Sequence, residues 1–122
     1  MQQFNPADPD FIGIWIDCPS ASIADLIGRN VVEGRLAASA SRMPEVVRTV
    51  VRRGRVERST ETPLLLVTRS HLFDAVAEVA QALHPGDNPS IMAMPYSDTT
   101  RQYLTWLETH TAASVLAPAK AG

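Results

Sequence analysis

Apolar residues along this chain form short continuous runs and longer stripes at helical spacing. The runs at 11–16 (FIGIWI) and 64–67 (LLLV) are bounded by polar residues or proline and predict buried strands. Two stripes repeat every three or four residues and predict amphipathic helices over about 20–34 and 70–83. The members of these stripes are Ile23, Leu26, Ile27 and Val31 in the first, and Leu72, Phe73, Val76, Val79, Ala80 and Leu83 in the second.

Signals for helix ends flank both stripes. Ser20 or Ser22 can accept hydrogen bonds from the first free amides of the first helix, and Gly34 can end it. Ser70 is the expected cap of the second helix. Pro85 disfavours the helical conformation at the residue before it, so the second helix is expected to end at 84–85.

Between the two helices, residues 46–68 read as two strands that fold back on each other about Arg53-Gly54. Glycine accepts the positive φ that such a tight reversal requires. After the second helix, 90–95 (SIMAMP) predicts another strand. The segment 98–110 then predicts a last helix, capped by Asp98, Thr99 or Thr100.

The resulting order is βαββαβ followed by a helix, which is the order of the ferredoxin-like α+β fold with a long hairpin between its second and third strands. Both main helices then lie on one face of the sheet. The runs 11–16 and 64–67, however, are apolar at successive positions and therefore on both faces. A second copy of the chain is the simplest cover for the other face, so the pattern predicts an oligomer.

Length and composition fit one globular domain. The chain has 122 residues, of which 45% are hydrophobic, and no apolar run reaches the length that spans a bilayer, so a membrane role is not expected. We expect the domain over 11–111, with a flexible N-terminus at 1–10 and a flexible Ala/Pro tail at 112–122. No secretory signal is visible at the start, and the single Cys18 excludes an internal disulfide, which favours a cytoplasmic protein.

Six short motifs in order resemble the CutA family, which is named for divalent-cation tolerance. They are CP at 18–19, EGRLAASAS at 33–41, Gly54 at the hairpin tip, LLLVTR at 64–69, the 83–95 segment LHPGDNPSIMAMP, and YLTWL at 103–107. The resemblance implies a homotrimer similar to the PII signalling proteins, with the hairpin packed against neighbouring subunits. It also implies a non-enzymatic role in divalent metal ion (copper) tolerance or response, or in PII-like signalling or scaffolding.

The chain departs from the family pattern at several positions. Family members usually have a cysteine where this chain has Ser39, and aromatic residues just before the hairpin glycine, Gly54. They commonly have tyrosine and glutamate where this chain has Gly86 and Ser90. These changes remove a soft ligand and an aromatic platform, so they weaken the inference of metal binding most.

Three residues remain as candidate metal ligands: Cys18, His84 and Asp87. Neutral imidazole, thiolate and carboxylate together suit Cu or Zn, although binding is expected to be weak because a tight site needs more ligands. The alternatives are structural: His84 can interact with the last carbonyls of its helix, and Cys18 can be a small buried apolar residue. The sequence favours these structural roles.

Arginines are concentrated on the expected hairpin, and they suggest an alternative function as an anion-binding or nucleic-acid-binding module through Arg52, Arg53 and Arg55. A regular strand would place Arg53 and Arg55 on one face and Arg52 on the other, except where Gly54 breaks the alternation at the turn. A formal net charge of -2 and the lack of neighbouring aromatics for base stacking argue against nucleic acid and favour a solvated surface. No catalytic motif is visible, and the sequence identifies no protein partner.

Overall fold

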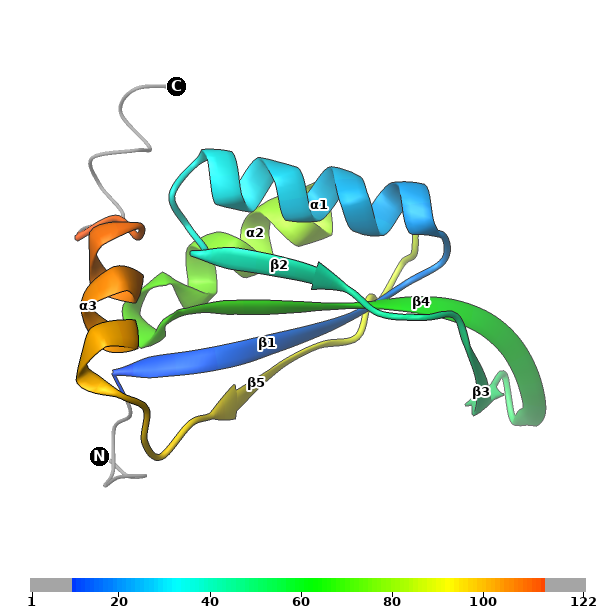
Figure 1. The fold of residues 1–122 in the computed structure, drawn as a ribbon. Coiled ribbons are helices and arrows are strands. Elements are labelled where there is room, and N and C mark those ends of the chain that lie inside the picture. Colours follow the sequence, from blue (N-terminus) through cyan, green and yellow to red (C-terminus); the bar gives the residue numbers. More distant parts are fainter. Residues whose placement is uncertain (1–9, 114–122) are drawn as a thin grey trace.

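The computed structural model describes residues 10–113; the predicted flexible ends at 1–10 and 112–122 lie almost entirely outside this range. Its elements follow the predicted order, with one added strand and one short 3-10 turn (Figure 1). They are β1 (Phe11–Cys18), α1 (Ala21–Glu33), β2 (Ser39–Arg42), β3 (Val46–Arg52), β4 (Arg55–Arg69), η1 (Ser70–Leu72), α2 (Phe73–Leu83), β5 (Ile91–Pro95) and α3 (Arg101–Thr109).

The strands form an antiparallel sheet in the order β2-β4-β1-β5, and β3 pairs with β4 alone. Helices α1 and α2 lie together on one face of this sheet (Figure 1). The predicted ferredoxin-like α+β fold is therefore confirmed. Strand β4 is long enough to pair with three strands: residues from Thr62 onward pair with β1, those from Leu64 to Val67 also pair with β2, and residues up to Glu61 pair with β3. The β3–β4 hairpin thus projects from the body as an arm (Figure 1).

Alternation along β1 and β4 directs one set of aliphatic side chains toward the helices. Helix α1 contributes Ile27 and Val31 to this layer, and helix α2 contributes Val76 and Ala80; none of the four is exposed. Replacing a buried leucine or isoleucine with alanine typically lowers the unfolding free energy by about 2–5 kcal/mol. The strand residues in this core are Ile12, Ile14, Ile16, Cys18, Leu64 and Leu66.

Two of the three α-helices begin at a capping residue that the sequence predicted. Ser20 Oγ accepts from the Ile23 amide at 3.2 Å, and Thr100 Oγ1 accepts from the Tyr103 amide at 3.2 Å. The cap predicted at Ser70 is wrong, because α2 begins at Phe73 and has Leu72 at the capping position. Ser70 instead opens the η1 turn, and its amide donates to the carbonyl of Asp10 beside β1.

The hairpin turn lies at Arg53-Gly54 as predicted. Both residues have positive φ, 54° and 75°, which is the conformation of a two-residue type I′ turn. The separate strand β2 was not predicted, because its four residues are mostly polar and carry no apolar run. A break at Met43-Pro44 divides it from β3, and proline supplies no amide to a strand ladder.

The sheet face away from α1 and α2 carries five apolar side chains, here called the open face: Trp15, Leu65, Val67, Met92 and Met94. Register places Leu65 and Met92 on either side of Trp15, so the group is contiguous across three strands. Met92 is 56% exposed and Met94 37% exposed. Helix α3 covers only one end of this side, through a small cluster of Phe11, Ala38 and Leu107.

Candidate functional site

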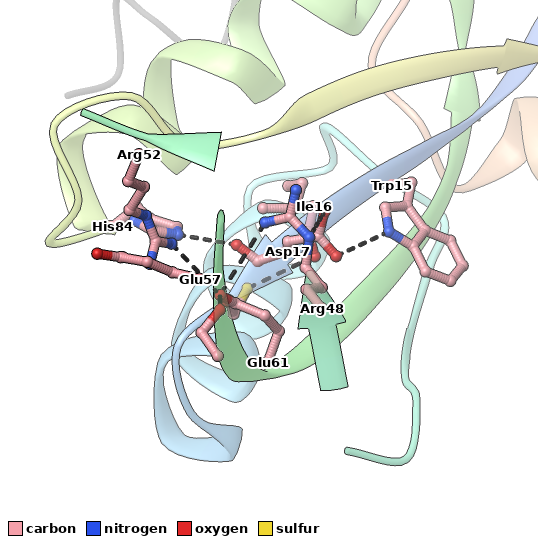
Figure 2. A network of polar contacts seen from close by, with 10 residues as sticks. Trp15, Ile16, Asp17, Arg48, Arg52, Glu57, Glu61 and His84 are labelled. Carbon is pink, nitrogen blue, oxygen red and sulfur yellow. Dashed lines mark hydrogen bonds and ion pairs between the residues drawn. The ribbon is translucent and has the colours of Figure 1, made fainter. Parts of the chain in front are cut away.

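A cleft of about 810 Å³ lies between the base of the arm, the end of β1 and the loop that joins α2 to β5. Two acidic residues, Asp17 and Glu61, line it from adjacent strands. Arg48 and Arg52 enter from β3, and the loop from His84 to Ser90 closes the remaining side. Figure 2 shows the polar contacts among these residues.

The two carboxylates, Asp17 and Glu61, are each only 8% exposed. Asp17 accepts a hydrogen bond from the Trp15 indole Nε1 at 3.0 Å, and Glu61 accepts one from the Ser59 hydroxyl at 2.9 Å. A buried carboxylate is costly unless its charge is compensated, so further partners are required. These partners come from the arm.

Arg48 bridges the two carboxylates, with its Nε 3.8 Å from Asp17 and its Nη1 4.0 Å from Glu61. Arg52 lies 3.9 Å from Glu61 and 3.7 Å from Glu57 (Figure 2). These two arginines therefore neutralise acidic groups in the cleft. The arm is thereby tied to the end of β1, and its arginines at these positions are not spare cations for a ligand.

His84 holds the loop against β1 through both ring nitrogens. The Gly86 amide donates to its Nδ1 at 2.9 Å, so that nitrogen is unprotonated and the proton lies on Nε2. Nε2 in turn donates to the carbonyl of Asp17 at 2.9 Å. With both nitrogens engaged, His84 must give up one of these bonds before it can bind a metal ion.

Cys18 lies at the end of β1 and is fully buried. Burial, together with the smaller effect of the negative charges of Asp17 and Glu61, raises the pKa of its thiol to about 11. Its Sγ contacts the carbonyl of Ile16 at 3.8 Å. The side chain is therefore a neutral thiol near pH 7, whereas metal ligation requires the thiolate.

The predicted ligands Cys18, His84 and Asp87 thus differ in their surroundings. His84 and Asp87 line the cleft, while Cys18 is sealed from solvent. Within residues 10–113, no three side chains among histidine, cysteine, aspartate and glutamate are grouped so that they could hold a metal ion. The expectation of weak Cu or Zn binding stays a prediction.

We expect isothermal titration of the purified protein with Cu²⁺ or Zn²⁺ to show no submicromolar site. A tight site generally needs three or four ligands in fixed geometry, and His84 is committed to Asp17 and Gly86. Submicromolar binding that disappears in the His84→Ala variant and survives in His110→Ala would contradict this expectation.

The raised pKa of the Cys18 thiol predicts a loss of stability at alkaline pH. Its pKa is higher in the folded protein than in the unfolded chain. The contribution of the neutral thiol to the unfolding free energy is therefore complete below about pH 9 and is lost as the pH rises through about 11. Urea unfolding at several pH values should show a steeper loss over this range for the wild type than for Cys18→Ala. Parallel losses in the two proteins would contradict this assignment.

The three arginines of the anion-binding alternative do not converge on the cleft; Arg52 alone lines it. Regular alternation does not hold at the turn, which is the exception expected at Gly54, since Arg52 and Arg55 are direct cross-strand partners and therefore share a face. The cause is the turn: Arg53 and Gly54 both take positive φ, and the strands close on either side of them.

Sequence reasoning missed the carboxylate pair of Asp17 and Glu61. A signal was present, because Asp17 directly follows one of the two apolar runs that were assigned to buried strands and Glu61 lies three residues before the other. An acidic residue at such a position needs a cationic partner, and the nearby arginines of the hairpin supply it. What the sequence lacks is the register that brings the two strand ends together.

By its fold, the chain is a ferredoxin-like α+β protein in which a projecting hairpin arm lies beside a charged cleft. Residues 12–110 match the family described as CutA1 divalent ion tolerance protein, and the chain belongs to this family. The resemblance that the sequence motifs indicated is confirmed. No helix within residues 10–113 is long and apolar enough to cross a membrane.

Three relatives illustrate the similarity. The Thermus thermophilus protein named divalent-cation tolerance protein CutA is 36% identical over 98 residues, covering 80% of this chain and 95% of that protein. The crystal structure of CutA from Xylella fastidiosa has a TM-score of 0.81 at 33% identity and covers 84% of this chain and 99% of that one. The Archaeoglobus fulgidus structure titled periplasmic divalent cation tolerance protein CutA has a TM-score of 0.79 at 27% identity, covering 82% and 97%.

Proposed function

We propose that this chain works as a homotrimer in the tolerance of divalent cations, copper among them, through PII-like signalling or scaffolding and not through catalysis. The working unit is the domain at 11–111, and the proposed compartment is the cytoplasm, in keeping with a single buried cysteine thiol. The observation that carries the proposal is the open face of the sheet.

The open face supports assembly because it is apolar, contiguous and only partly shielded. Trp15 and Leu65 lie at its centre, and Met92 is more than half exposed. Apolar patches of this kind commonly mark an interface, and copies of one chain usually associate with closed symmetry. The arm adds three valines on a single face, Val47, Val51 and Val56, which are 59%, 70% and 74% exposed.

The cleft supports a role other than tight ion storage or catalysis. Its buried carboxylates, Asp17 and Glu61, are compensated by Arg48 and by donors from Trp15 and Ser59. Groups held in this way are poorly placed to transfer protons or to ligate a resident ion. Any copper contact at His84 and Asp87 is therefore proposed to be weak.

A growth experiment tests the proposal. Deleting the gene in the source organism should lower the copper concentration that arrests growth, and the wild-type gene should restore it. A Leu65→Lys gene, which places a charge on the open face, should fail to restore tolerance, whereas Leu26→Lys on the outer side of α1 should succeed. Unchanged copper tolerance in the deletion strain would contradict the proposed role, and full rescue by a monomeric Leu65→Lys protein would show that assembly is not needed.

A further inference from the structure

A pair of methionines lies at the edge of the open face, on strand β5. Met92 and Met94 are two residues apart, so the pleat of the strand directs both side chains to the same side of the sheet. Both side chains are exposed, and β5 pairs with β1 alone in the sheet of the described residues. The two thioether sulfurs can therefore reach one common ligand.

The indole of Trp15 lies beside this pair and is held in place. Trp15 is the direct cross-strand partner of Met92, and its Nε1 donates a hydrogen bond to Asp17 at 3.0 Å (Figure 2). Side chains in direct cross-strand positions have Cβ atoms about 4.5–5.5 Å apart. A cation bound at Met92 would therefore lie close to the indole, and tryptophan is the aromatic side chain that attracts cations most strongly.

The chemistry of thioether sulfur limits which cation the pair can bind. This sulfur is soft and uncharged, so it favours Cu(I) over Mg²⁺ or Ca²⁺, which prefer oxygen ligands. Zn²⁺ sites in proteins are built from thiolate, imidazole and carboxylate ligands. Packing between subunits is the alternative use of exposed methionines, because their flexible side chains fill gaps. Leucine would serve packing equally well and would bind no metal, so the two uses can be separated by experiment.

We propose that Met92 and Met94 bind one Cu(I) ion per subunit through their thioether sulfurs, with the indole of Trp15 beside the ion. The choice of copper rests on the proposed function, whereas binding is measured independently of it. The site is compatible with the trimer, since Met92 also lines the cleft and an ion can approach it from there. Thioether ligation requires no water, so copies that cover the open face would shield the bound ion.

Methionine methyl NMR tests the site directly. Cu(I) is supplied without oxygen as its acetonitrile complex, and Ag(I) serves as a second soft ion that is stable in air. We expect the Met92 and Met94 methyl resonances to shift and to saturate at one ion per chain, while the Met43 resonance stays in place. Met92→Leu and Met94→Leu should each weaken binding by about tenfold or more, because each removes one of the two sulfur ligands. Leucine conserves volume and apolar character, so light scattering of both variants should give the wild-type mass.

The controls separate this site from the other soft or titratable groups. Met43→Leu and Cys18→Ala should bind Cu(I) as the wild type does. The affinity should also stay constant between about pH 5.5 and 7.5, because a thioether has no proton to lose, whereas imidazole and thiolate do. The proposal is overturned by Met92 and Met94 resonances that do not shift, by full binding in the double leucine variant, or by loss of binding in Cys18→Ala. All these measurements use the purified protein, so they decide the site whether or not the deletion strain loses copper tolerance.

Discussion

Replacing Leu65 with lysine is expected to dissociate the proposed trimer completely at micromolar concentration. Leu65 lies at the centre of the open face, between Ser41 on one neighbouring strand and Trp15 on the other. A lysine there would place an unpaired charge at the centre of each apolar interface, and burying such a charge costs several kcal/mol. Light scattering should then give the mass of one 13.3 kDa subunit, or the protein should unfold.

The matched control for this change is Leu26→Lys. Leu26 is 43% exposed on α1, on the opposite side of the sheet from the open face. It carries the same chemical change at a surface outside the proposed interface, so assembly should persist. A Leu65→Lys protein that keeps the wild-type mass would contradict the placement of the interface.

The second large effect is expected at His84, where alanine should lower the unfolding free energy by about 2 kcal/mol. The substitution removes two hydrogen bonds, one to the carbonyl of Asp17 and one from the amide of Gly86. Each such bond contributes about 0.5–1.5 kcal/mol, and a carbonyl left without its donor adds to the loss. Urea denaturation measures the change directly.

Two further variants serve as controls for the His84→Ala result. Asp87→Ala, in the same loop and exposed, should change the unfolding free energy by less than about 0.5 kcal/mol. His84→Gln can keep a donor directed toward Asp17 and should recover part of the loss. A His84→Ala protein as stable as Asp87→Ala would show that the two hydrogen bonds do not hold the loop.

The 83–95 segment runs from the end of α2 through β5, and its His84 has a structural role. Proline 85 ends α2 at Leu83 as predicted, and the His84 backbone is extended, with φ -80° and ψ 130°. That conformation directs the chain back toward β1, where the His84 ring bonds to Asp17. The residue therefore acts first as a bridge between the loop and the sheet.

The sequence predicted those parts of the fold that local patterns determine. Apolar runs located β1 and the buried half of β4, and helical stripes located α1 and α2. The Arg53-Gly54 dipeptide located the hairpin turn, because the conformational freedom of glycine marks a tight reversal. Apolar residues on both faces of the strands also predicted a second apolar face that α1 and α2 do not cover, and Leu65 and Met92 beside Trp15 show where it lies.

The parts that were missed depend on contacts between distant segments. Serine is a common helix-capping residue, but the Ser70 amide donates a hydrogen bond to the carbonyl of Asp10, and the chain forms a 3-10 turn before α2. The cleft depends on register, which brings Asp17 beside Glu61 and Arg48 across three strands. Spacing along the chain carries no information about such register, so the contact of Arg48 with both carboxylates was not predicted.

The most direct test of the central claim is the mass of the wild-type protein in solution. Multi-angle light scattering at micromolar concentration should give three times 13.3 kDa, because the open face is expected to be buried between subunits. The result should hold on dilution through the micromolar range. A well-folded protein with the mass of a single 13.3 kDa chain would contradict the account.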